Sequence, residues 1–105
     1  MSNIYDYIDD MRQRPSMFTT DLSIGPLEWL LQGYCACLQS NEIEETYAGR
    51  RFHPGDFSEW LYGEIGWSGA RGFAFAIEEN TATPAEAFDT FFRLVQQFRQ
   101  GKVPK

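Results

Sequence analysis

Apolar residues recur every three or four positions through residues 25–39. Five of them share one helical face: Leu27, Leu30, Leu31, Tyr34 and Leu38. The opposite side is also largely apolar, through Trp29, Ala36 and Cys37. A helix that is apolar on nearly every side is typical of a protein interior. We therefore predict a mostly buried central helix here, with the other elements packed around it.

The N-terminal segment, residues 3–13, is predicted to form a short amphipathic helix. Ser2 or Asn3 can cap its start, and Pro15 ends it because proline cannot continue the backbone hydrogen bonding. An irregular connector then leads to the central helix. We expect two side chains of this connector to pack back against the central helix: Met17 and Phe18.

Three more helices are predicted in the C-terminal half of the chain. One begins at Pro54 or at Asp56. Residues 70–77 fit either a helix or a strand, and we prefer the helix because a lone strand has no partner elsewhere. The last helix begins at the capping residue Thr83 and ends near Gly101, with an aromatic stripe along one side.

Length and composition fit one compact domain. The chain has 105 residues, of which 43% are hydrophobic, enough to form a core without metal ions or disulfides. We predict an all-α, single-domain bundle of about five helices around the buried central helix. This domain should cover residues 1–100, followed by a flexible C-terminal tail at residues 101–105.

The chain is acidic, with fifteen Asp and Glu residues against nine Lys and Arg and a formal net charge of −6. The imbalance is larger in the helical part, because both lysines, Lys102 and Lys105, lie in the tail. Such a charge disfavours binding to nucleic acid or to an anionic membrane and suits a basic partner. Solubility alone explains the same charge in many small acidic proteins, so both interpretations stay open.

Neither a secretory signal nor a membrane-spanning segment is expected. The first residues lack a basic and apolar leader, and no run approaches the roughly 18 apolar residues that cross a membrane. We therefore expect a cytoplasmic protein. Cys35 and Cys37 project about 200° apart on a helix and cannot bond to each other, so we expect both to be reduced core residues.

Groups that could form a catalytic or metal site are few. His53 is the one histidine, and the sequence has no cluster of His, Cys and acidic residues with metal-ligand spacing. We therefore expect no metal, no cofactor and no enzymatic activity. A small enzyme that pairs His53 with Glu59 or Glu64 is the interpretation that the sequence supports least.

A set of anchors runs through the chain between about residues 5 and 98. The positions are Arg14-Pro15, Met17-Phe18, Gly33-Tyr34, Phe57, Trp60-Leu61, Gly66-Trp67, Glu86-Ala87-Phe88, Phe91-Phe92 and Leu94. This framework resembles that of small bacterial immunity proteins, the cytoplasmic antidotes encoded beside contact-dependent or other polymorphic toxins. The resemblance implies a tightly bound toxin partner, often a nuclease, that is blocked at or near its active site. It implies no catalytic residues in this chain.

Acidic residues in the loop after the central helix and in the third helix are the candidate contact surface. A nuclease needs a basic groove for phosphates, so its inhibitor gains by presenting carboxylates there, and fields of opposite sign speed association. The candidate acidic contacts are Glu42, Glu44, Glu45, Asp56 and Glu59. The candidate aromatic anchors are Tyr47, Tyr62 and Trp67, although Trp67 fits the core equally well.

The same framework also fits a cytoplasmic adaptor, or a helical protein that self-associates, without any toxin partner. Hydrophobic anchors specify packing more than activity, so the sequence leaves this alternative open. A stable homo-oligomer that buries the acidic faces would favour it.

Overall fold

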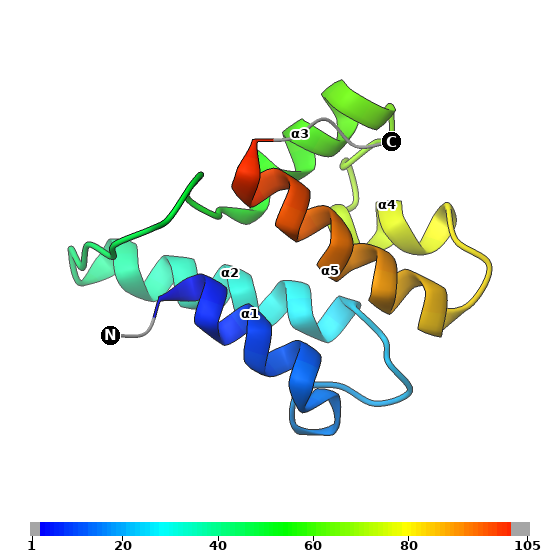
Figure 1. Ribbon diagram of the computed structural model, residues 1–105, viewed down its shortest axis with the longest axis horizontal. Helices are drawn as coiled ribbons and strands as arrows, with labels where there is room; N and C mark the ends of the chain where they lie inside the picture. Colours follow the sequence, from blue (N-terminus) through cyan, green and yellow to red (C-terminus); the bar gives the residue numbers. More distant parts are fainter. Residues whose placement is uncertain (1–2, 102–105) are drawn as a thin grey trace.

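The computed structural model describes residues 3–101, which form five α-helices and one short 3-10 helix and contain no β-strand. The elements are α1 (Ile4–Gln13), η1 (Pro15–Met17), α2 (Gly25–Ser40), α3 (Pro54–Ile65), α4 (Phe73–Glu79) and α5 (Pro84–Gln100). Figure 1 shows them packed into one bundle. The prediction of an all-α bundle of about five helices is confirmed. Residues 102–105 of the predicted tail lie outside the described part of the chain.

The helices form two groups that meet at α4 and at the contact between α2 and α3. In one group α1 and α2 run in opposite directions against each other, and in the other α3 packs on α5 (Figure 1). Helix α4, drawn in yellow, contacts α2, α3 and α5 although it has only seven residues. Helix α2 contacts α1, α3 and α4, and in that sense it is the central helix.

Interlocked aromatic rings form the part of the core that α3, α4 and α5 share. The ring of Phe57, which is fully buried, has its centroid 5.3 Å from that of Phe73 and 5.4 Å from that of Phe98. Three more rings pack on it with centroids within 6.1 Å: Phe52, Trp60 and Phe91. Such aromatic pairs contribute about 0.5–1.5 kcal/mol each beyond the area they bury, so the cluster fixes how the three helices lie.

Helix ends follow the signals in the sequence at four places. Asn3 caps α1, and its side chain accepts hydrogen bonds from backbone N–H groups of the first turn. The side chain of Thr83 caps α5 in the same way, and Gly101 ends that helix in the left-handed conformation. Of the two predicted starts for α3, Pro54 is the one used, with His53 as the capping residue.

The prediction that α2 is buried on nearly every side is wrong. Its buried positions are Leu27, Leu31 and Leu38. Trp29, by contrast, is 74% exposed and Leu30 is 38% exposed. A chain of this length has too few helices to cover a 16-residue helix all round. The longest helix, α5, packs on α3 and α4 and leaves the Trp29 side of α2 open.

Two smaller expectations are also corrected. Cys37 is exposed, and only Cys35 approaches the core, where its Sγ lies 3.9 Å from the Phe52 carbonyl oxygen. Met17 is 69% exposed and does not pack on α2. Phe18 does turn inward, but its ring meets Tyr7 of α1 edge to face at 5.6 Å. The reason is that η1 folds back along α1, which places the connector beside that helix.

The loop between α2 and α3 is fixed near its middle to the end of α5. The Arg50 N–H donates to the Arg99 carbonyl oxygen at 2.8 Å, and Arg99 Nε donates to the Ala48 carbonyl oxygen at 3.0 Å. From α1, the Tyr5 hydroxyl donates to the Arg50 carbonyl oxygen, and burial raises the pKa of Tyr5 to about 12. At Gly49 a Cβ atom would lie 2.3 Å from the Arg99 carbonyl oxygen, so a larger residue does not fit.

The cost of adding a methyl group at Gly49 can be measured against a matched glycine. Gly49 has φ +100° and Gly66 has φ +88°, but a Cβ at Gly66 meets no atom within 4 Å. We expect Gly66→Ala to lower the free energy of unfolding by about 1–2 kcal/mol through backbone strain alone. Gly49→Ala should lose at least about 1 kcal/mol more, because it also separates Arg50 from Arg99. Urea unfolding measures both, and equal losses would show that the loop is not held by this contact.

Candidate partner-binding groove

The eight residues predicted to contact a partner fall into two regions. Four lie in the loop after α2: Glu42, Glu44, Glu45 and Tyr47. Four lie on α3 or directly after it: Asp56, Glu59, Tyr62 and Trp67. Figure 1 shows the loop beyond the C-terminal end of α2, at the left, whereas α3 ends at the top right. The fold therefore does not gather all eight into one patch.

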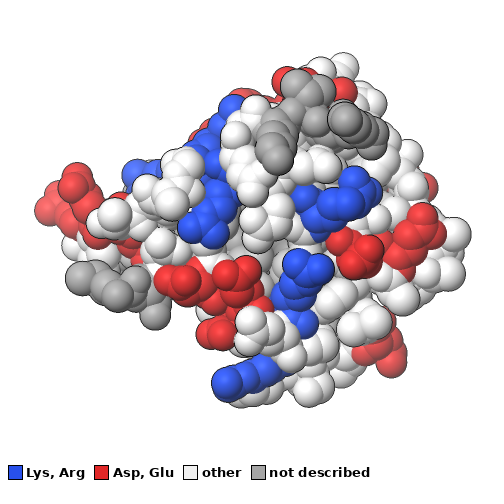
Figure 2. Space-filling view, viewed as in Figure 1, with Lys and Arg blue, Asp and Glu red and all other residues white. Residues whose placement is uncertain are grey.

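The tip of the loop is acidic and open to solvent. Glu42 and Glu44 are both exposed. Figure 2 shows acidic side chains gathered at this tip, with basic side chains close by on the same face. Exposed carboxylates on a loop are free to meet a basic partner, but the mixed charge around them weakens the field that they project.

Glu45 differs from its neighbours because its carboxylate is used inside the molecule. It is half-buried and accepts hydrogen bonds from the Ile4 N–H at 3.1 Å, the Tyr47 hydroxyl at 2.9 Å and the Tyr34 hydroxyl at 2.5 Å. Burial, together with the bond to Glu45, raises the pKa of both tyrosines. Glu45 and Tyr47 thus hold the loop against α1 and α2, and their polar groups are already satisfied.

The residues on α3 also differ in what they offer. Trp67 is half-buried and packs against the core. Asp56, Glu59 and Tyr62 are exposed, and the Tyr62 side chain is 58% accessible. Of these, Glu59 and Tyr62 line a groove, whereas Asp56 does not.

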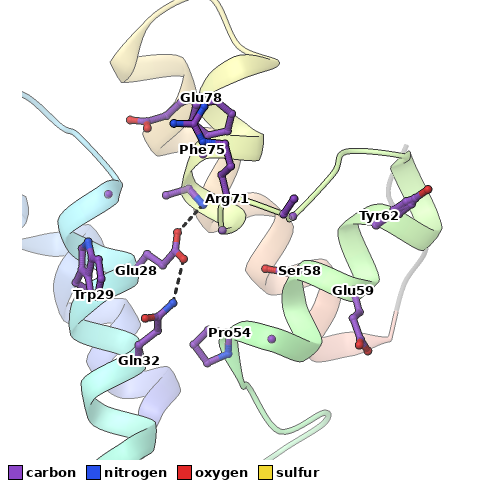
Figure 3. Close-up of a pocket in the computed structure, with 16 residues that line it drawn as sticks. Glu28, Trp29, Gln32, Pro54, Ser58, Glu59, Tyr62, Arg71, Phe75 and Glu78 are labelled. Carbon is purple, nitrogen blue, oxygen red and sulfur yellow. Dashed lines mark hydrogen bonds between the residues drawn. The ribbon is translucent and has the colours of Figure 1, made fainter.

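This groove lies between α2, α3, α4 and the connection before α4, and its volume is about 780 Å³ (Figure 3). Trp29 comes from α2 on one side, and Glu59 and Tyr62 come from α3 on the other. Volumes of this size are typical of sites that hold a ligand or a peptide side chain. Exposed aromatic side chains beside a groove are a common feature of binding surfaces.

Glu28 forms the part of the groove between α2 and α4. Its Oε1 accepts the Ala74 N–H at 2.9 Å, in the first turn of α4, and its Oε2 accepts Gln32 Nε2 at 3.0 Å (Figure 3). Negative charge is favourable at a helix N-terminus. Gly72 allows this approach, because a Cβ atom there would lie 2.2 Å from Glu28 Oε2. Burial, with a smaller effect of nearby Glu78, raises the pKa of Glu28.

Among residues 3–101, one basic residue lines the groove beside these carboxylates. The guanidinium carbon of Arg71 lies 4.1 Å from the centroid of the Phe75 ring, within the range of a cation–π contact. The acidic residues of the lining are Glu28, Glu59 and Glu78. The groove therefore combines an excess of negative charge with aromatic surfaces, which suits a cationic group better than an anionic one.

The histidine is used in a helix cap. His53 Nδ1 accepts the Gly55 N–H at 3.1 Å as part of the α3 cap, and His53 does not line the groove. Within residues 3–101 no group of three His, Cys, Asp or Glu side chains could hold a metal ion. No helix in this described part of the chain is long and apolar enough to cross a membrane.

Comparison with known proteins gave no match to a family model, a curated protein or a solved structure.

Sequence reasoning found Glu59 and Tyr62 but missed the other half of the groove. The apolar pattern of residues 25–39 did not single out Glu28, and it placed Trp29 in the interior, whereas Trp29 is 74% exposed. Arg71 and Glu78 come close to Glu28 only because α4 packs on α2. A signal did exist in Glu28, since an acid within an otherwise apolar helix needs a partner.

The different roles of Glu45 and Glu44 can be separated by substitution. Glu45→Ala removes the acceptor of three hydrogen bonds, so we expect a loss of about 2–3 kcal/mol in the free energy of unfolding. Glu44→Ala, at an exposed position one residue away, should change the free energy of unfolding by less than about 0.5 kcal/mol. Thermal and urea unfolding measure both values. If Glu45→Ala were as stable as Glu44→Ala, Glu45 would be a free surface carboxylate after all.

The raised pKa of Glu28 predicts how stability depends on pH. The folded state binds the proton of the Glu28 carboxyl more tightly than the unfolded state does. The stability that this protonation contributes is therefore complete at low pH and is lost as pH rises through the raised pKa. Glu28→Gln keeps an acceptor for the Ala74 N–H and removes the charge near Glu78. We expect the variant to lack this loss and to melt at or above the wild-type temperature at pH 7. Melting curves from pH 4 to 7 test this, with Glu79→Gln, an exposed residue outside the groove, as control.

Proposed function

We propose that this chain is an immunity protein that binds a cognate toxin domain, in particular a basic nuclease, and covers or adjoins its active site. The observation that carries the proposal is the groove, where Trp29 and Tyr62 are exposed beside the carboxylates of Glu28, Glu59 and Glu78. The resemblance of the hydrophobic framework to small immunity proteins points to the same class of function.

Electrostatics provide the means of fast recognition. A nuclease binds phosphates through basic groups, so carboxylates placed against those groups compete with the nucleic acid. The net charge of −6 attracts such a surface over a distance, and complementary fields raise association rates toward about 10⁸–10⁹ M⁻¹s⁻¹ at low salt. An antidote must bind before the toxin acts, so a fast association rate is an advantage.

The groove is a better centre for this interface than the loop after α2. Interface energy concentrates on a few large aromatic side chains, and the groove offers Trp29 and Tyr62 while the loop offers Tyr47, which is half-buried. Glu45 is occupied by internal hydrogen bonds. The exposed Glu42 and Glu44 remain candidates for steering a basic partner from the edge of the interface.

A self-associating protein or an adaptor is the second candidate, because Trp29 and Leu30 form exposed apolar surface on α2. Pairing two copies through this side would bring the carboxylates of both grooves close together. Like charges repel, so the acidic groove argues for a basic partner over a second copy.

A two-stage experiment tests the function. The tagged protein is used to capture partners from the native lysate at low salt, followed by elution at high salt and mass spectrometry. The recovered protein is then expressed alone and together with this chain. We expect a basic protein that arrests growth when alone and is harmless with its antidote. A self-complex, or a partner that is not toxic, would reject the immunity function.

The same pair then tests the role of the groove. We expect Trp29→Ala to weaken binding at least about 30-fold, the effect of a central aromatic contact. Met17→Ala is the control, because Met17 is 69% exposed and lies outside the groove. Calorimetry of the purified pair gives both dissociation constants, and equal values would place the interface elsewhere.

A further inference from the structure

One cationic group already lies on an aromatic ring within the groove. Arg71 lies with its guanidinium group over the Phe75 ring, at 4.1 Å from the centroid. A planar cation on an aromatic face is therefore stable in this environment. Trp29 and Tyr62 offer two more rings along the same groove, and both are exposed. The free chain thus has aromatic surface to hold a second guanidinium group.

The Glu28 carboxylate would attract a cation into the groove. Its carboxylate is half-buried, and the hydrogen bonds to it come from neutral donors, the Ala74 N–H and the Gln32 amide. Glu78 on α4 adds a second negative charge nearby. A charge held in this way gains more from a cationic partner than a fully solvated carboxylate does.

We propose that the groove binds an arginine side chain carried by an exposed segment of the basic partner, with the guanidinium group held between the Trp29 ring and the carboxylates of Glu28 and Glu78. Arginine fits better than lysine because its planar group stacks on rings and donates in pairs to carboxylates. The volume of about 780 Å³ leaves room for the backbone on either side of that residue. The choice of a protein as the source of the arginine rests on the proposed function.

Short peptides test the groove without any knowledge of the partner. The probes are acetylated and amidated Gly-Arg-Gly, with lysine or citrulline in place of arginine in two controls, added to ¹⁵N-labelled protein. We expect the arginine peptide to shift the signals of the Trp29 indole, Gly72 and Ala74. Lysine should bind several-fold more weakly, and citrulline, which has the shape but not the charge, should not bind measurably.

Two variants on one helix separate the groove from general electrostatics. Glu78→Gln and Glu79→Gln each remove one exposed carboxylate from α4, but only Glu78 lines the groove. We expect Glu78→Gln to weaken the arginine peptide about five- to tenfold and Glu79→Gln less than twofold. Trp29→Ala should weaken it by a similar factor to Glu78→Gln. Equal effects of the two glutamine variants, or shifts confined to the loop around Glu44, would overturn the assignment.

The outcomes for the groove and for the immunity function are independent. If the chain neutralises a toxin but the arginine peptide leaves the groove signals unchanged, the function stands and the arginine site is wrong. If the peptide binds as expected but no toxic partner exists, the site stands and the immunity function is wrong. Binding of citrulline as tight as that of arginine would reduce the site to a surface for any polar chain.

Discussion

The rest of the arrangement depends on the contacts that hold helix α4 in place, because this helix is not stable by itself and lies between α2, α3 and α5. Seven residues are too few for a helix to be stable alone in water. Phe73 locks one side of it into the aromatic cluster, 5.3 Å from both Phe57 and Phe91. The Glu28 carboxylate holds its first turn to α2. Through these contacts α4 joins the α1–α2 pair to the α3–α5 pair, and it closes one end of the groove.

Two half-buried carboxylates of this acidic chain connect different elements of the fold. Glu28 connects α2 to α4, and Glu45 connects the loop after α2 to α1 and back to α2 through Tyr34. Each is half-buried and hydrogen-bonded to backbone N–H groups or hydroxyls. The acidic composition therefore has a structural part and a surface part, and the sequence pattern alone does not separate them.

The sequence predicted well what depends on local chemistry. The cap at Thr83 follows from neighbouring residues, as do the two candidate caps of α1 and the two candidate starts of α3, of which the structure uses Asn3 and Pro54. The choice of a helix over a strand near Phe73 rested instead on the lack of a partner strand elsewhere in the chain. Predictions that depended on which surface of a helix is covered by another helix were less accurate. Trp29 belongs to an apolar pattern whether or not another helix lies over it, so its exposure could not be predicted. The same limit hid the groove, which exists only because α4 packs between α2 and α3.

The position of the groove has a thermodynamic consequence. Glu28 has to be ionised to attract a cation, yet burial and Glu78 raise its pKa and make the charged form costly in the free chain. In the proposed arginine site, a bound cation would offset this cost while leaving the bond from Ala74 in place, so ligand binding and the anchoring of α4 would be coupled through one carboxylate. Glu45 cannot act in this way, because three donors already satisfy it. A carboxylate that serves the fold without being fully satisfied by it is the kind of group from which a binding site is built.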